Sequence, residues 1–273
     1  MRCPQPREDE QSTNSGWWGR RLDPDRSLGL RLTLASVAAL LVLVPFSVLA
    51  LLVVTAWSPL RDLDESLAGS LHAHALGNPG WASAMQTWTD VFGPGPLRVT
   101  VLVVVVWLWW RGARRVALWA ATTTVAGGVL GATLKLLFGR ERPDLLDPVS
   151  HAPGYAFPSG HALTAALATG VLLLVFLPVA GGIGGARRRR AARWGLWLAA
   201  VVVTLVTGLS RIALGVHWSS DVLGGWVLGA AVVAATTAAF ATWRGRVRRR
   251  PSAPLTEGVF ERESPSTPTA PGA

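Results

Sequence analysis

Residues 116–138 read VALWAATTTVAGGVLGATLKLLF, and this stretch decides the fold class. Its one charged side chain, Lys135, lies close to its end. A run of about 18 or more apolar residues is what a helix needs to cross a hydrocarbon layer roughly 30 Å thick. Half of the whole chain is apolar and only 15% is charged. The stretch therefore predicts a membrane-spanning helix, and the composition predicts that the chain folds mainly in lipid.

Five further apolar runs lie on either side of this stretch, at 32–57, 97–110, 161–179, 194–209 and 222–242. Because helices satisfy their own backbone hydrogen bonds in lipid, we expect an all-α bundle of six transmembrane helices over residues 31–243. The more polar region 58–92 predicts an exterior loop with short, interfacial helices. Residues 1–30 and 244–273 are polar and rich in Pro and Ser, which predicts two disordered cytoplasmic tails.

The net charge of +10 raises the possibility of nucleic-acid binding. The arginines, however, form short clusters between and beyond the apolar runs, at 111–115, 187–193 and 244–250, as in the cytoplasmic loops of membrane proteins. Six spans with both termini inside place every dense cluster in the cytoplasm, whereas omitting the weak run 97–110 would move one cluster outside. We therefore expect a multi-pass protein of the cell membrane with both termini cytoplasmic and no nucleic-acid partner.

Three segments keep polar residues beside the spans, and the predicted topology places all three at the exterior end. They read KLLFGRERP at 135–143, FPSGH at 157–161 and SRIALGVHWSSD at 210–221. Charged groups near hydrocarbon are costly, so a cluster of them indicates a functional site. The active site is therefore expected at the exterior end of the bundle.

Lys135, Arg142 and Arg211 supply three positive charges and many donors, which suits a multiply charged oxyanion such as phosphate. Ser159 and Gly160 lie where a loop enters a helix, so a hydroxyl and backbone N–H groups can point at the same anion. Two His and one Asp could ligate a metal, but three neighbouring cations would repel it. The residues predict a phosphate site with no metal and no cofactor.

His217 and Asp221 lie four residues apart. If this segment is helical they share a face, so Asp221 can accept from one imidazole nitrogen and hold the other as a nucleophile. His161 supplies a second imidazole from a different helix, able to protonate the departing oxygen and later to activate water.

The motifs Lys-x6-Arg-Pro, Pro-Ser-Gly-His and Ser-Arg-x5-His-x3-Asp, in this order, resemble the three-part signature of the type 2 phosphatidic acid phosphatase and vanadium haloperoxidase superfamily. Every signature position is filled, and Pro143, Pro158, Ser210 and Gly215 support the motifs. The resemblance implies that His217 is the nucleophile, Asp221 its orienting partner and His161 the acid and base. It also implies a phosphate-binding set of Lys135, Arg142, Ser159, Gly160 and Arg211.

The family branch that this membrane chain resembles hydrolyses lipid phosphates through a phosphohistidine. The implied substrates are a polyprenyl pyrophosphate such as undecaprenyl pyrophosphate, phosphatidic acid or phosphatidylglycerol phosphate. A phosphotransferase that passes the phosphate to an alcohol remains an alternative. Six spans disfavour a soluble haloperoxidase, and an anion transporter would need polar groups at mid-membrane. The expected partners are the lipid substrate and membrane lipids, and the oligomeric state stays open.

Other conspicuous residues have structural interpretations. His72 and His74 lie in the polar region 58–92 and are expected to be solvated, whereas His151 could line the site. The glycines of the last span are expected to permit close helix packing rather than chemistry, namely Gly224, Gly225 and Gly229.

Overall fold

The computed structural model of the protein describes residues 43–145, 150, 153–182 and 184–246, and every regular element in them is an α-helix. The all-α prediction is confirmed. Helix Leu43–Val54 is followed by α3 (Ser58–Gly77), α4 (Pro79–Val91), α5 (Pro94–Trp110), α6 (Arg114–Phe138), α7 (Gly160–Gly181), α8 (Ala186–Ala213) and α9 (Ser219–Arg246). The predicted tails lie outside the described residues except at 244–246, where α9 ends, so their character stays a prediction.

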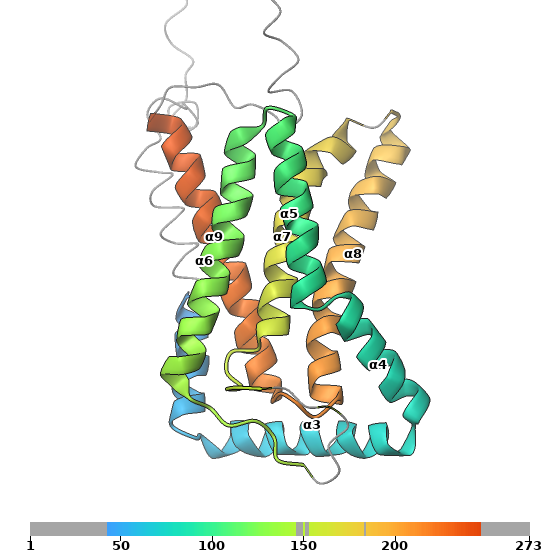
Figure 1. The fold of residues 1–273 in the computed structure, drawn as a ribbon, viewed down its shortest axis with the longest axis vertical. Helices are drawn as coiled ribbons and strands as arrows, with labels where there is room; N and C mark the ends of the chain where they lie inside the picture. Colours follow the sequence, from blue (N-terminus) through green and yellow to red (C-terminus); the bar gives the residue numbers. More distant parts are fainter. Residues whose placement is uncertain (1–42, 146–149, 151–152, 183, 247–273) are drawn as a thin grey trace, which may run out of the picture.

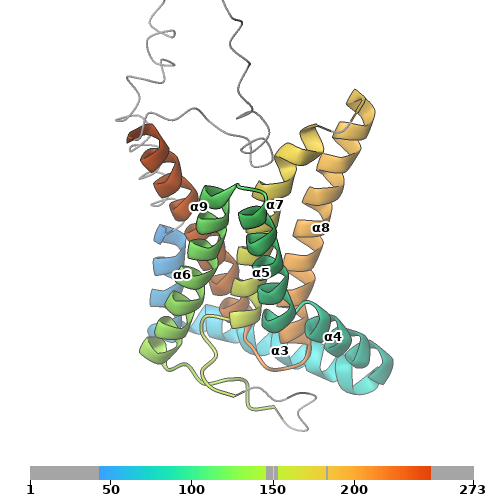
Figure 2. The ribbon, with the colours of Figure 1, turned by 45° about the horizontal axis from the view of Figure 1, so that its top comes forward.

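Helices α5 to α9 run side by side along the long axis, and α3 lies across one end of this bundle (Figure 1). Figure 2 shows the same crosswise position of α3 from a second direction. Five segments are long and apolar enough to cross a membrane, and a sixth is added if Leu43–Val54 and α3, bent by 86°, count as one span. The six predicted spans thus correspond to five or six candidate spans.

Proline and glycine set several of the helix boundaries. Helices α3, α4 and α5 each have a proline in their first helical positions, where its fixed φ suits the helix and its missing N–H costs nothing. Helix α6 ends at Gly139, whose φ of 58° is the left-handed conformation of a helix C-cap. This stop releases the chain into the polar segment that carries Arg142.

Helix α7 is the centre of the bundle, because it packs against α5, α6, α8 and α9. Its contact with α9 depends on small residues. A Cβ at Gly225 would lie 2.6 Å from the carbonyl oxygen of Ser159, and one at Gly229 would lie 2.6 Å from Cβ of Ala166. A Cβ at Gly224 would meet the ring of Phe157 at 2.6 Å. The predicted packing role of these glycines is confirmed.

The boundaries of two spans were predicted too narrowly. Helix α8 begins at Ala186, so the arginines at 187–193 lie on a helix and not in a loop, and its last turn includes Ser210 and Arg211. Helix α9 begins at Ser219, so Asp221 lies in its first turn. An apolar run marks only the part of a helix that suits lipid, and arginine continues a helix readily beyond it.

Region 58–92 contains helices, as predicted, but α3 and α4 are longer than the short helices expected. Only Asn78 separates them in the sequence. Helix α4 joins α5 in one candidate span, Pro79–Trp110. Helix α3 buries Asp64, Ala68, His72 and Ala75 along one face. That face lies against α8 and α9, so α3 closes the end of the bundle at which the polar segments meet.

Candidate active site

The three polar segments meet at the end of the bundle that α3 crosses. The last turn of α6, the first turn of α7, the last turn of α8 and the first turn of α9 all lie there (Figure 1). The amide of Ser159 donates to the carbonyl of Asp221 at 2.9 Å, and Nε1 of Trp218 donates to the carbonyl of Glu141 at 3.1 Å. Hydrogen bonds to backbone carbonyls therefore join the second segment to the third and the third to the first.

His217 and Asp221 are both buried, and Nδ1 of the imidazole lies 3.3 Å from Oδ2 of the carboxylate. The predicted contact is present, but the predicted shared helical face is not. His217 lies in the loop before α9, and Oδ2 of Asp221 also accepts from the amide of Trp218 at 2.9 Å. The loop folds back onto the first turn of α9, and this brings His217 into contact with Asp221, four positions later.

The second imidazole nitrogen of His217, Nε2, lies 3.1 Å from Nη1 of Arg142. The same guanidinium donates to the carbonyls of Val216 at 2.6 Å and Gly154 at 2.8 Å, which fix its position. A neutral imidazole with its proton on Nδ1, toward Asp221, leaves a lone pair on Nε2. This lone pair then faces a cation that suits a phosphate oxygen.

Lys135 reaches the same place from the last turn of α6. Its Nζ donates to the carbonyl of Tyr155 at 2.7 Å, and Nη2 of Arg142 donates to the same oxygen at 3.4 Å. A Cβ at Gly160 would lie 3.7 Å from Cε of Lys135. Lys135 also interacts electrostatically with Arg211. Three like charges are thus close together, and an anion among them would relieve their repulsion.

Two of the predicted phosphate-binding residues each have a buried side-chain atom with no hydrogen-bond partner among the described residues. These atoms are Oγ of Ser159, at the N-cap of α7, and Nε of Arg211, in the last turn of α8. Nη1 of Arg211 donates to Oγ1 of Thr89 at 3.3 Å. Buried polar groups are ordinarily paired. The oxygens of a bound phosphate could satisfy both atoms.

His161 lies in the first turn of α7, one residue after Gly160. It interacts electrostatically with Arg211, His217 and Lys135, so it belongs to the same cluster. Its Nε2 would lie 3.7 Å from a Cβ at Gly93, the break between α4 and α5. The two predicted catalytic imidazoles therefore share one site but come from different elements.

Burial lowers the pKa of His217 to about 4. Asp221 opposes this shift through its hydrogen bond and its charge, whereas the charges of Arg142 and Lys135 add to it. His217 is consequently neutral near pH 7 and keeps the Nε2 lone pair. Burial also lowers the pKa of the Arg142 guanidinium, and the charge of Asp221 opposes that shift.

The motif-supporting residues shape the backbone around the site. Gly215 has a φ of 70°, and a Cβ there would lie 2.9 Å from Cδ1 of Leu145, so the turn before His217 favours glycine. Oγ of Ser210 donates to the carbonyl of Thr207 at 2.8 Å within α8. Pro158 is buried and Pro143 is partly buried on the chain segments between the helices.

Asp64 of α3 is a buried member of this end of the bundle to which the sequence analysis gave no role. Its side chain is 1% exposed and accepts from Oγ of Ser219 at 2.6 Å and from the amide of Ser220 at 2.9 Å. Its Oδ2 lies 2.9 Å from Nη2 of Arg140. Asp64 therefore fixes the start of α9 to α3.

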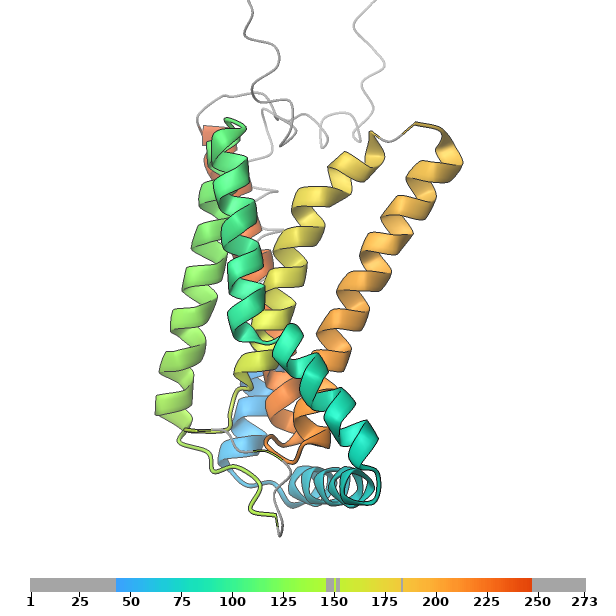
Figure 3. The same ribbon diagram turned by 45° about the vertical axis from the view of Figure 1, so that its right-hand side comes forward.

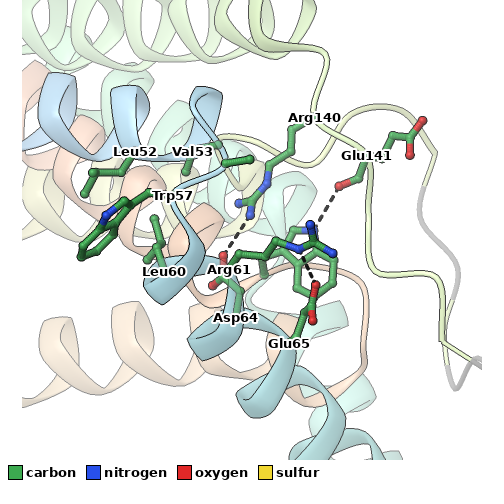
Figure 4. A pocket seen from close by; sticks show the side chains of 11 residues that line it. Leu52, Val53, Trp57, Leu60, Arg61, Asp64, Glu65, Arg140 and Glu141 are labelled. Atoms are coloured by element: carbon green, nitrogen blue, oxygen red, sulfur yellow. Dashed lines mark hydrogen bonds and ion pairs between the residues drawn. The ribbon is translucent and has the colours of Figure 1, made fainter.

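Arg140 was also missed, although it lies inside the first motif. Its Nη1 lies 2.6 Å from Oδ1 of Asp221 and 2.7 Å from Oγ of Ser220. Figure 4 shows its side chain reaching Asp64 beside a cavity of about 380 Å³ that Trp57 helps to line. The signal available in the sequence was a charge at position 140 between the motif's Lys and Arg, but position alone does not reveal its carboxylate partners.

The remaining histidines differ from one another. His72 is buried against the site end of the bundle, with an exposed fraction of 7%, so the expectation that it is solvated is wrong. The reason is that α3 turns this face toward α8 and α9. His74 is exposed, and its ring lies nearly perpendicular to that of Trp81 with 4.9 Å between the ring centroids. His151 lies outside the described residues.

In the part of the chain that the structure describes, no three His, Cys, Asp or Glu side chains gather in a way that could hold a metal ion. The acidic residues nearest His217 are instead paired with it or with Arg140. Metal independence of the reaction remains a prediction.

Comparisons with known proteins agree with this layout. Residues 116–245 match the family model of the PAP2 superfamily. The chain is 28% identical over 138 residues to an undecaprenyl-diphosphatase of Sulfolobus acidocaldarius. These aligned residues are 48% of this chain and 56% of that protein. It is 35% identical over 104 residues to phosphatidylglycerophosphatase B of Bacillus subtilis, covering 37% and 46%. A second undecaprenyl-diphosphatase, from Bacillus subtilis, is 32% identical over 133 residues, covering 47% and 60%.

The chain thus matches about half the length of each of these relatives. The fold is similar to the crystal structure of a transmembrane PAP2-type phosphatidylglycerolphosphate phosphatase from Bacillus subtilis, with a TM-score of 0.63 and 22% identity. That likeness covers 73% of this chain and 94% of the other. The region that matches the PAP2 superfamily contains all three polar segments from Lys135 to Asp221, and over this region the chain is similar to that superfamily.

Proposed function

We propose that this protein is a membrane phosphatase that hydrolyses a phosphomonoester or pyrophosphate of a lipid through a phosphohistidine on His217. The observation that carries the proposal is the placement of His217 between Asp221, 3.3 Å from Nδ1, and Arg142, 3.1 Å from Nε2. One contact orients the ring, and the other puts a phosphate-binding cation beside the free nitrogen. The relatives are named as phosphatases of lipid phosphates, which supports the substrate class.

The proposed reaction has two displacements. Nε2 of His217 attacks phosphorus, the bond to the leaving oxygen breaks, and His161 gives that oxygen a proton. His161 then takes a proton from water, whose oxygen attacks the phosphohistidine, and the phosphorus–nitrogen bond breaks to release phosphate. Lys135, Arg142 and Arg211 bind the equatorial oxygens in both steps and meet the charge that develops there. Transfer to an alcohol in place of water would give the phosphotransferase alternative.

The site is proposed to face the exterior of the cell. The arginine clusters at 111–115 and 187–193 lie at the opposite end of the bundle from His217, and such clusters favour the cytoplasm. Asn78, between α3 and α4, and Ala186, at the start of α8, are exposed at the two ends. With Cys3 changed to Ser, Asn78→Cys should react with an impermeant maleimide in intact cells and Ala186→Cys should not. The reverse pattern would place the site in the cytoplasm.

The activity itself is tested with purified protein and a panel of lipid phosphates, comprising undecaprenyl pyrophosphate, phosphatidic acid and phosphatidylglycerol phosphate. We expect release of inorganic phosphate from at least one of them and none from the His217→Ala variant. An anion transporter would release none from any of them, and that result would overturn the proposal.

A further inference from the structure

A groove lies between α7 and α8 at the end of the bundle opposite the candidate active site. Its volume is about 830 Å³, and its walls include Leu177 of α7 and Leu198 and Val201 of α8. Figure 3 shows α7 and α8 running side by side toward this end. Pro178 lies inside the last turns of α7, where proline bends helices. The groove is therefore formed by residues of both helices near this end of the bundle.

The mouth of this groove is basic and aromatic. Arg189, Arg190 and Arg193 line it together with Trp194 and Trp197. All five side chains are exposed, and among the described residues none of the three arginines makes an ion pair. The first turn of α8 contains no acidic residue, so the partial positive charge of the helix end adds to theirs. The groove thus combines arginines that have no acidic partner among the described residues with apolar walls.

A second, apolar recess of about 440 Å³ lies between the same two helices, bounded by Phe176 and Val179 of α7 and by Ala192 and Leu196 of α8. Inorganic phosphate could use only the arginines at the mouth. An amphiphile can use both parts of the α7/α8 groove, because its anionic head meets the guanidinium groups and its chains follow the apolar walls. Tryptophan is typical of the headgroup level of a membrane, where Trp194 and Trp197 would lie.

We propose that this α7/α8 groove binds an anionic phospholipid, with the phosphate on Arg189 and Arg193 and the acyl chains along Leu177, Leu198 and Val201. Basic pockets between transmembrane helices commonly accept anionic headgroups. The arginines could serve only to keep this end of the bundle in the cytoplasm, but that role needs no more than positive charge near the membrane. It does not explain why arginine and tryptophan line the same groove. The bound lipid fills the gap between two helices whose far ends carry His161 and Arg211.

The test is native mass spectrometry of the full chain in neutral detergent, titrated with tetraoleoyl cardiolipin, dioleoyl phosphatidylcholine or inorganic phosphate. Cardiolipin is chosen because its phosphodiesters are not phosphomonoester substrates. The groove variant is Arg189→Gln/Arg193→Gln. The matched control is Arg187→Gln/Arg188→Gln, which removes the same charge from the same helix but outside the groove. Gln keeps the side chains polar on an exposed surface, so both variants should fold.

We expect wild type to bind cardiolipin about tenfold or more tightly than phosphatidylcholine, and the groove variant to lose that preference while the control keeps it. Cardiolipin should also raise the Tm of wild type and of the control, but not that of the groove variant. Equal loss in both variants would show general attraction to a basic surface and overturn the proposal. Unchanged binding in the groove variant, or displacement of cardiolipin by millimolar phosphate, would overturn it as well.

Discussion

Nη1 of Arg140 lies 2.6 Å from Oδ1 of Asp221, the carboxylate whose other oxygen faces His217. Nη2 of the same guanidinium lies 2.9 Å from Asp64, so Arg140 joins α3 to the first turn of α9. All of these side chains except that of Arg140 are essentially buried, and Arg140 itself is 19% exposed. Arg140 therefore acts on the proposed nucleophile through Asp221, without touching Nε2.

This relationship predicts a difference between two arginines that lie two residues apart. Arg142→Gln removes a proposed phosphate ligand, so it should raise KM and lower kcat. Arg140→Gln removes the contacts to Asp221, Asp64 and Ser220 but no proposed phosphate ligand, so it should lower kcat about tenfold to a hundredfold with KM nearly unchanged. Steady-state kinetics on one lipid phosphate measure both. A rise in KM for Arg140→Gln as large as that for Arg142→Gln would identify Arg140 as a phosphate ligand and not a positioning residue.

The buried environment of His217 predicts the acid limb of the pH profile. Its pKa is lowered from 6.5 to about 4, so the nucleophile becomes protonated only below about pH 4, and kcat/KM should stay high down to that pH. Asp221 raises this pKa. In Asp221→Asn the acid limb of the kcat/KM profile should therefore move to lower pH on the same substrate, and the maximum kcat/KM should fall. A limb near pH 6.5 in wild type, or a shift upward in Asp221→Asn, would contradict the assignment.

The parts of the site that the sequence predicted are those whose signals are local. Each apolar run marks a helix, and the motif spacing identified Lys135, Arg142 and His217, all of which lie at one end of the bundle. The parts that it missed depend on contacts between distant residues. Asp64 and Arg140 are 76 positions apart, and no local pattern shows that α3 turns its buried face toward the bundle.

Three of the proposed phosphate ligands, Lys135, Arg142 and Arg211, are cationic side chains, which predicts that no divalent metal is needed. Activity should be unchanged in excess EDTA, and vanadate should inhibit because it mimics five-coordinate phosphorus in the transition state. Phosphate release with and without each reagent is the measurement. Loss of activity in EDTA with recovery on addition of magnesium or zinc would overturn metal independence.

His161 is proposed to act on the leaving oxygen, so its importance should depend on the leaving group. His161→Ala should abolish hydrolysis of a lipid phosphate but keep some release of p-nitrophenol from p-nitrophenyl phosphate, whose leaving group is already a weak base. His217→Ala should lose both activities and serves as the comparison. Equal loss on the two substrates in His161→Ala would rule out a role confined to protonation.

The central claim is that His217 carries the phosphate, and rapid-quench labelling with a phosphorus-32 lipid phosphate tests it most directly. Wild type should form a phosphoprotein that is labile in acid and stable in base, as expected of phosphohistidine. His161→Ala can still accumulate label from a substrate with a good leaving group, and Asp221→Asn should label more slowly because the imidazole is poorly oriented. His217→Ala should not label at all. Label in His217→Ala together with none in His161→Ala would show that the two histidines have the opposite roles.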